Sequence, residues 1–170
     1  MNIYPTPLDG LFLIEPRVFE DDRGFFLESY QADRYKELGM VDDCVQDNHS
    51  RSIKGVLRGM HYQIKHPQTQ IITVMRGSIY DACVDLRPTS PTFGDWYGIT
   101  LSDTGPRQLY MAPGLAHGFC VLSEVVDLHY KVSQNYDPHD EGGLLWSDRD
   151  IGIEWPISTP NVSERDNQFS

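Results

Sequence analysis

The sequence predicts an all-β fold, a jelly-roll barrel with a few short helices. Short runs rich in valine, isoleucine, tyrosine and phenylalanine alternate with turn-forming residues over most of the chain, a pattern typical of sandwiches and barrels built from short strands. Only residues 31–38, closed by Gly39, show a clear helix pattern. The 170 residues suit one core and contain no internal repeat, so we expect residues 1–170 to form a single domain.

The predicted strands follow one another from residue 46 onward. Gln46 and Asn48 share one face of the first of them, because side chains alternate along a strand. Later strands are predicted at residues 56–63, 71–75, 78–86, 119–126 and 127–132. We expect 71–75 and 78–86 to form a hairpin around Gly77, and the last two runs to form another pair.

The end of the chain differs from the rest. Residues 144–170 are mostly polar but contain Trp146 and Trp155. Large aromatic side chains are stabilised by burial. We therefore expect this tail to be an ordered wrap against the domain.

The bulk composition excludes several classes of function. The formal net charge is −11, which argues against a nucleic-acid-binding surface, although local arginines can still bind a phosphate. No apolar run approaches the ~20 residues of a membrane helix, and the N-terminal ten residues lack the features of a secretory signal. We expect a cytoplasmic protein.

Three widely spaced cysteines, Cys44, Cys83 and Cys120, form neither a disulfide framework nor a zinc motif. Cys83 and Cys120 lie in apolar runs and are expected to be small buried side chains.

Two histidines lie in segments that suggest a site. His61 is expected to share a strand face with Leu57, Gly59 and Gln63. Taken alone, this pattern favours a hydrogen-bonded core histidine over a ligand-binding one. His117 follows the turn at Pro113-Gly114, which delivers it to the start of a strand.

Together the two segments resemble the halves of a cupin metal site, a motif found in barrels of this type. Gln63 stands where the first half would carry its second histidine, and an amide is a poor transition-metal ligand beside imidazole. We expect no bound metal, with a metalloenzyme based on His61 and His117 as an alternative.

Several stretches, taken in order, resemble one family, the dTDP-4-dehydrorhamnose 3,5-epimerases. The similarity extends from about Leu11 to about Asp166. The matching stretches are Asp22-Arg23-Gly24-Phe25-Phe26-Leu27-Glu28, Gln46-Asp47-Asn48-His49-Ser50, Gly55-Val56-Leu57-Arg58-Gly59-Met60-His61-Tyr62-Gln63, Val84-Asp85-Leu86-Arg87, Ser90-Pro91-Thr92-Phe93-Gly94, Ala112-Pro113-Gly114-Leu115-Ala116-His117-Gly118-Phe119, Tyr130-Lys131, Tyr136-Asp137-Pro138 and Ile153-Glu154-Trp155-Pro156.

The resemblance implies a cupin-like barrel, a homodimer, and catalysis without metal or organic cofactor. It implies a nucleotide-linked substrate, a dTDP-4-keto-6-deoxyhexose, in deoxysugar biosynthesis of the rhamnose type. The hydrogens on C3 and C5 of such a sugar are acidic because both carbons adjoin the C4 ketone. Inversion through an enolate needs a base on one face of the sugar and an acid on the other.

The resemblance also implies roles for individual residues. His61 matches the catalytic base, Asp166 the carboxylate that pairs with it, and Tyr130 the opposed acid. His117 matches a pocket histidine. Substrate-binding positions are matched by Arg23, Glu28, Gln46, Asn48, Arg58 and Tyr136.

Two features depart from a simple match. Arg58 and His61 have opposite strand parity, so a bulge at Gly59 is needed to bring both into one site. Gln70 stands where the family usually has a lysine, which is expected to stabilise the enolate oxygen through a stronger, charge-assisted hydrogen bond.

Gln70 leaves open a mono-epimerase acting at C3 or C5 alone, or an epimerase of a CDP- or GDP-linked sugar. A binding module without catalytic activity is a further alternative. The combination of His61, Tyr130 and Asp166 argues against it, because a binder needs no opposed base and acid.

Overall fold

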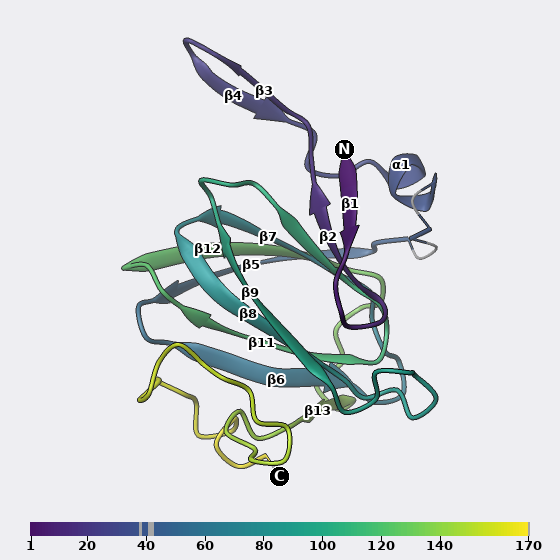
Figure 1. Ribbon diagram of the computed structural model, residues 1–170, viewed down its shortest axis with the longest axis vertical. Coiled ribbons are helices and arrows are strands. Elements are labelled where there is room, and N and C mark those ends of the chain that lie inside the picture. The colour runs from purple at the N-terminus through teal and green to yellow at the C-terminus, as the bar shows by residue number, and fades with distance from the viewer. Residues whose placement is uncertain (38, 41–42, 170) are drawn as a thin grey trace.

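The computed structural model describes residues 1–37, 39–40 and 43–169. Two antiparallel sheets face each other, and a separate hairpin projects away from them (Figure 1). The six-stranded sheet has, in spatial order, β1 (Asn2–Pro5), β2 (Leu11–Glu15), β10 (Gln108–Met111), β7 (Gln70–Arg76), β12 (Val125–Val132) and β5 (Gln46–Ile53). The five-stranded sheet has β13 (Glu141–Gly143), β6 (Leu57–Gln63), β11 (Leu115–Val121), β8 (Ser78–Asp85) and β9 (Trp96–Ser102).

The chain passes repeatedly from one sheet to the other, so most neighbouring strands are distant in sequence. The main core lies between the sheets. Ile72, Leu109 and Leu128 point into it from the six-stranded sheet, and Ile79 and Cys83 from the five-stranded one. The predicted all-β jelly roll is confirmed, and Cys83 and Cys120 are fully buried as expected.

Both predicted hairpin pairings are wrong. Strands β7 and β8 flank Gly77, yet β7 pairs with β10 and β12, and β8 pairs with β11 and β9. Likewise β11 and β12 lie in different sheets. The alternation of apolar residues gives the buried face of each strand but not its partner, and at these two reversals the chain crosses to the other sheet.

Gly77 permits the first of these crossings. Its φ is +83°, in the left-handed region. A Cβ at this position would lie 2.3 Å from both Ser123 Oγ and Val125 O. The sharp turn therefore requires glycine.

The single helix among the described residues is α1 (Ala32–Glu37), close to the predicted 31–38; Leu38 lies outside the described residues. The Gln31 side chain accepts a hydrogen bond from the backbone N–H of Arg34 at 2.6 Å, which satisfies one free donor of the first turn. Tyr35 anchors the helix and is 2% exposed. None of the helices in the described ranges is long and apolar enough to cross a membrane.

The tail is the ordered wrap that its tryptophans predict. Trp155 donates a hydrogen bond from Nε1 to the carbonyl of Trp146 at 2.8 Å. Its ring packs on the outer face of the five-stranded sheet, against the cluster of Met60, Val84 and Ala116. Figure 1 shows this yellow segment lying along β6 and β13, and Asp166 within it reaches His61 on β6.

Strands β3 (Val18–Asp21) and β4 (Gly24–Leu27) form the hairpin that projects from the barrel in Figure 1. Phe19, Phe25 and Phe26 on this hairpin are all exposed. Three exposed phenylalanines on one small element are unusual for a surface that contacts only water.

Candidate active site

One pocket collects most of the residues that the sequence singles out. It opens between the two sheets at one end of the barrel, and strands of both sheets contribute to it. It is lined by Gln46, Asn48, Ser50, Arg58, His61, Tyr62, Gln63, Gln68, Gln70, His117, Phe119, Leu128, Tyr130, Val132, Tyr136, Glu141 and Arg165.

The six-stranded sheet supplies a wall of amides. Gln46 and Asn48 share the inner face of β5, as predicted, and Gln46 Nε2 donates to Asn48 Oδ1 at 2.8 Å. Gln46 Oε1 also accepts from the backbone N–H of Tyr136 at 3.1 Å, which fixes the segment above the pocket. Gln70 is the first residue of β7. It lies on the same inner face of that strand as Ile72 and Val74, which belong to the core.

The expected bulge in β6 is present. Arg58 pairs with Phe119 and His61 with His117, so two residues of β6, Gly59 and Met60, oppose Gly118 alone. The extra residue reverses the parity and places Arg58 and His61 on the same pocket-facing side. The expectation that Leu57 shares the face of His61 is therefore wrong.

Gly118 and Gly59 make this bulge compatible with the neighbouring strand. A Cβ on Gly59 would lie 2.5 Å from the Cα of Gly118. Gly59 also has a φ of +131°. Gly59 is therefore required for β6 to pack against β11, independently of any space that it leaves for a ligand near His61.

His61 is held by a carboxylate from the tail. Its Nε2 lies 2.8 Å from Asp166 Oδ1, and Asp166 Oδ2 accepts from the backbone N–H of Gly59 at 3.2 Å. Burial works to raise the pKa of Asp166, but the hydrogen bonds from His61 and Gly59 outweigh it and lower that pKa. The ionised carboxylate accepts the Nε2 proton, so Nδ1 carries the free lone pair of the imidazole.

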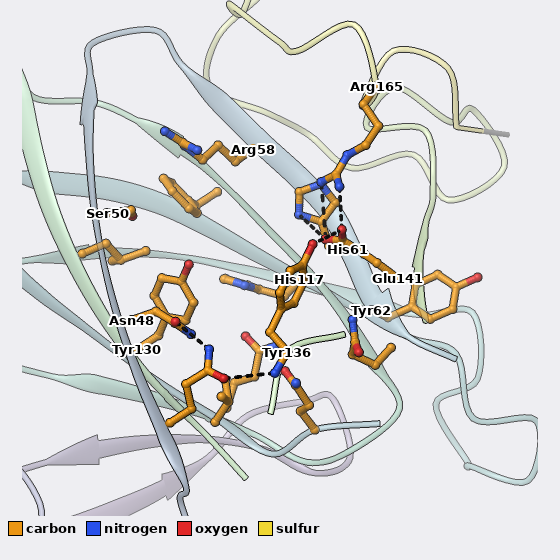
Figure 2. A pocket seen from close by; sticks show the side chains of 17 residues that line it. Asn48, Ser50, Arg58, His61, Tyr62, His117, Tyr130, Tyr136, Glu141 and Arg165 are labelled. Carbon is orange, nitrogen blue, oxygen red and sulfur yellow. Dashed lines mark hydrogen bonds and ion pairs between the residues drawn. The ribbon is translucent and has the colours of Figure 1, made fainter. Parts of the chain in front are cut away.

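Tyr130 faces the same pocket from the opposite sheet. It lies on β12 beside Asn48, whereas His61 belongs to β6. Figure 2 shows Tyr130 and His61 on different sides of the pocket. Burial raises the pKa of the Tyr130 hydroxyl, an effect that the charge of Arg58 partly offsets, so this phenol is protonated at neutral pH.

His117 has a carboxylate partner of its own. Its Nε2 lies 2.8 Å from Oδ2 of Asp81, which is fully buried on β8. Burial raises the pKa of Asp81, and the interaction with His117 partly offsets that rise. This pair holds His117 in one orientation beneath the pocket.

The described residues that surround the pocket histidines do not form a ligand set for a metal. Within residues 1–37, 39–40 and 43–169 there is no group of three or more His, Cys, Asp or Glu side chains placed to hold an ion. Each pocket histidine is directed at its own aspartate. Gln63 donates to the carbonyl of Asp137 and is occupied in holding that loop.

Two predicted binding residues do not line the pocket of their own chain. Arg23 lies at the tip of the β3–β4 hairpin, where it forms an ion pair with Asp21 at 2.5 Å. Glu28 follows the hairpin and pairs with Arg34 at 2.8 Å. The hairpin projects away from the barrel and carries Arg23 with it (Figure 1), whereas Glu28 lies at the base of the hairpin, beside α1.

Sequence reasoning missed two charged residues of the pocket, Glu141 and Arg165. Arg165 Nη1 donates to Glu141 Oε2 at 2.5 Å, and the Tyr136 hydroxyl donates to the same oxygen at 2.7 Å. Arg165 directly precedes Asp166, which was a usable signal. Glu141 enters the site because β13 pairs with β6, a contact that no local pattern indicates.

A sequence model of one family, dTDP-4-dehydrorhamnose 3,5-epimerase, matches residues 5–170. The chain belongs to the dTDP-4-dehydrorhamnose 3,5-epimerase family. It is therefore an isomerase of the epimerase class.

Members of this family cover nearly the whole chain. A dTDP-4-dehydrorhamnose 3,5-epimerase of Shigella flexneri is 45% identical over 98% of this chain and 93% of its own length. A dTDP-4-dehydrorhamnose 3-epimerase of Streptomyces niveus is 40% identical over 98% of this chain and 81% of its own.

A solved structure of the family agrees in fold. The dTDP-6-deoxy-D-glucose-3,5-epimerase of Legionella pneumophila Philadelphia 1, crystallised with dTDP-4-keto-L-rhamnose, superposes with a TM-score of 0.94 and is 46% identical. The match covers 97% of this chain and 89% of that one.

Proposed function

We propose that this epimerase inverts C3 and C5 of a dTDP-linked 4-keto-6-deoxyhexose, in a deoxysugar pathway of the rhamnose type. The observation that carries the proposal is the opposition of His61 and Tyr130, which reach one pocket from two facing sheets. A base and an acid on opposite sides of a sugar ring are what inversion through an enolate requires.

The proposed chemistry uses the protonation states described above. Asp166 holds the Nε2 proton of His61, so Nδ1 accepts a proton from carbon. The C4 ketone takes up the charge as an enolate. The protonated Tyr130 then delivers its proton to the opposite face of the same carbon. The ketone itself makes the C–H bonds acidic, so these residues suffice without a metal or cofactor.

We assign the rest of the pocket to substrate binding. Arg58 has its Nε donating to Ser52 and leaves the other guanidinium nitrogens for the diphosphate. The amides of Gln46, Asn48 and Gln70 supply donors and acceptors to the sugar and base. His117 and Tyr136 complete the walls.

We further infer a homodimer in which the β3–β4 hairpin of each copy reaches the pocket of the other. Arg23 and Glu28 match substrate-binding positions but do not line their own pocket. The exposed Phe19, Phe25 and Phe26 of the hairpin would then be covered by the second copy. The cytoplasmic location expected from the sequence stays a prediction.

Gln70 favours one second candidate, a mono-epimerase. A neutral amide stabilises an enolate less than an ammonium group does. The weaker stabilisation slows most the inversion with the higher barrier, so one of the two carbons would no longer be inverted. The similarity to a 3-epimerase as well as to 3,5-epimerases is compatible with either outcome.

The deciding experiment is NMR of dTDP-4-keto-6-deoxyglucose with the protein in deuterated water. Deuterium uptake with inversion at both C3 and C5 supports the double epimerase, and uptake at one carbon supports the mono-epimerase. A folded protein that exchanges neither proton contradicts both.

A further inference from the structure

The proposed inversion leaves both proton-transfer groups in the wrong state. After each event His61 holds an extra proton and Tyr130 lacks its own. The next inversion needs the reverse. A second inversion on the same bound sugar therefore requires that Tyr130 regain a proton from solvent and that His61 lose one while the pocket is occupied, and the loss from His61 needs a route.

Asp166 is unsuited to that route. It is 3% exposed, and its two oxygens accept hydrogen bonds from His61 and from the backbone of Gly59. It lies on the Nε2 side of the imidazole, and its neighbour Arg165, whose Nε is 3.6 Å from Oδ1, is a cation that cannot accept a proton. The exit must therefore begin at Nδ1.

Glu141 connects Nδ1 to the rim of the pocket. Its Oε1 lies 3.9 Å from His61 Nδ1, and its Oε2 accepts from the Tyr136 hydroxyl at 2.7 Å. The Glu141 side chain is 10% exposed, whereas Tyr136 is 47% exposed and meets solvent. Figure 2 shows Glu141 and Tyr136 beside His61.

Two contacts hold this carboxylate in place. Glu141 begins β13 and pairs with Gln63, two residues beyond His61 on β6. Arg165 donates to both of its oxygens, at 2.5 and 3.4 Å. The same tail segment thus positions Asp166 on one nitrogen of His61 and Glu141 near the other.

We propose that Glu141 is a proton relay that returns His61 to its neutral form between inversions. The inference rests on the proposed epimerase function. The Nδ1–H bond breaks and the proton passes to Glu141 Oε1, leaving neutral imidazole and a carboxylic acid. The acid then gives the proton to water at the rim beside Tyr136. A shift of the Glu141 side chain or one bridging water closes the 3.9 Å gap.

The test uses Glu141→Gln, which keeps the side-chain size and an acceptor for Tyr136 but cannot carry a proton. Solvent exchange of substrate protons should slow by ~10²-fold in dilute buffer, the scale of a lost proton-transfer group. At constant pH and ionic strength, added imidazole buffer should restore much of the rate, because a small base replaces Glu141. The wild type should not respond to buffer.

The matched control is Glu124→Gln, which removes an exposed carboxylate that pairs with Lys54 at 2.9 Å. It should behave as the wild type. If E141Q does not fold, Tyr136→Phe tests the rim end of the route and should show a smaller, buffer-sensitive slowing.

An E141Q enzyme that is slow at every buffer concentration would overturn the relay, because Glu141 would then only position its neighbours. Full activity of E141Q in dilute buffer would overturn it as well. A wild type that exchanges no sugar proton would instead refute the proposed function, and the relay with it.

Discussion

At the scale of single residues, the assignment of His61 as base and Tyr130 as acid predicts different outcomes for the two variants that remove them. His61→Ala should abolish exchange at C3 and C5, since removal of a general base costs ~10²–10⁴-fold or more. Tyr130→Phe should retain proton removal by His61 but lose delivery to the other face, so deuterium enters with retained configuration. NMR in deuterated water measures both quantities. Equal losses of exchange and inversion in Y130F would mean that Tyr130 only shapes the pocket.

Gln70 is the residue at which this chain departs from its family pattern. The structure places it on the inner face of β7, in the pocket, and its amide has no hydrogen-bond partner within the described part of the chain. Gln70→Lys should speed exchange, with a gain bounded by the ~10²–10³-fold value of one preorganised donor. Gln70→Ala should slow it. Unchanged exchange in Q70A would make the position a bystander.

At the scale of elements, the tail is predicted to be part of the catalytic unit. Asp166→Asn should slow exchange strongly without a matching fall in thermal stability, because the amide cannot hold the Nε2 proton of His61 as an ionised carboxylate does. Removal of residues 163–170 should have at least the same effect. Activity assays paired with melting curves measure this, and a tail-less enzyme with normal turnover would refute it.

The turn after β8 is predicted to make stability depend on pH. Burial works to raise the pKa of Asp85, but hydrogen bonds from Arg87, Ser90 and Thr92 outweigh it and hold that pKa well below its usual range. A lowered folded pKa stabilises the protein above the unfolded value, ~4, and this contribution is lost as pH falls toward the folded value.

Asp85→Asn should therefore destabilise the protein by about 3–5 kcal/mol near pH 7, as for other broken buried pairs. The difference from the wild type in urea unfolding should shrink below pH 4. Glu124→Gln, on an exposed loop, should show no such trend. A pH-independent gap for D85N would indicate that Asp85 contributes through packing alone.

At the scale of the whole molecule, the proposed dimer predicts complementation between defective chains. Arg23→Ala and His61→Ala should each be strongly impaired. In a mixed dimer one pocket would receive both defects and the other neither, so an equal mixture should recover about a quarter of wild-type activity if subunits exchange freely.

His61→Ala mixed with Tyr130→Phe is the control. Both residues lie in the pocket of their own chain, so no intact site forms and no activity should return. Light scattering should report a dimer for each variant. A monomeric protein, or an R23A and H61A mixture that stays inactive, would contradict the exchange of hairpins.

The sequence by itself determined the all-β class, the burial of Cys83 and Cys120, and the ordered tail. These depend on local patterns: which face of a strand is apolar, and where large aromatic side chains interrupt a polar segment. The pocket residues His117, Tyr130 and Tyr136 came instead from the resemblance of the whole sequence to one family. Gln46 and Asn48 share a face simply because they are two residues apart.

Only the tertiary structure decided which strands pair, how His61 meets Asp166, and that Glu141 belongs to the site. His61 and Asp166 are 105 residues apart in sequence. The apolar pattern of a strand is satisfied by any partner that buries its face, so the choice between a local hairpin and a crossing at Gly77 depends on how all the strands close the barrel together. The bulge at Gly59 is likewise a property of two strands, because its extra residue is defined only against Gly118 on β11.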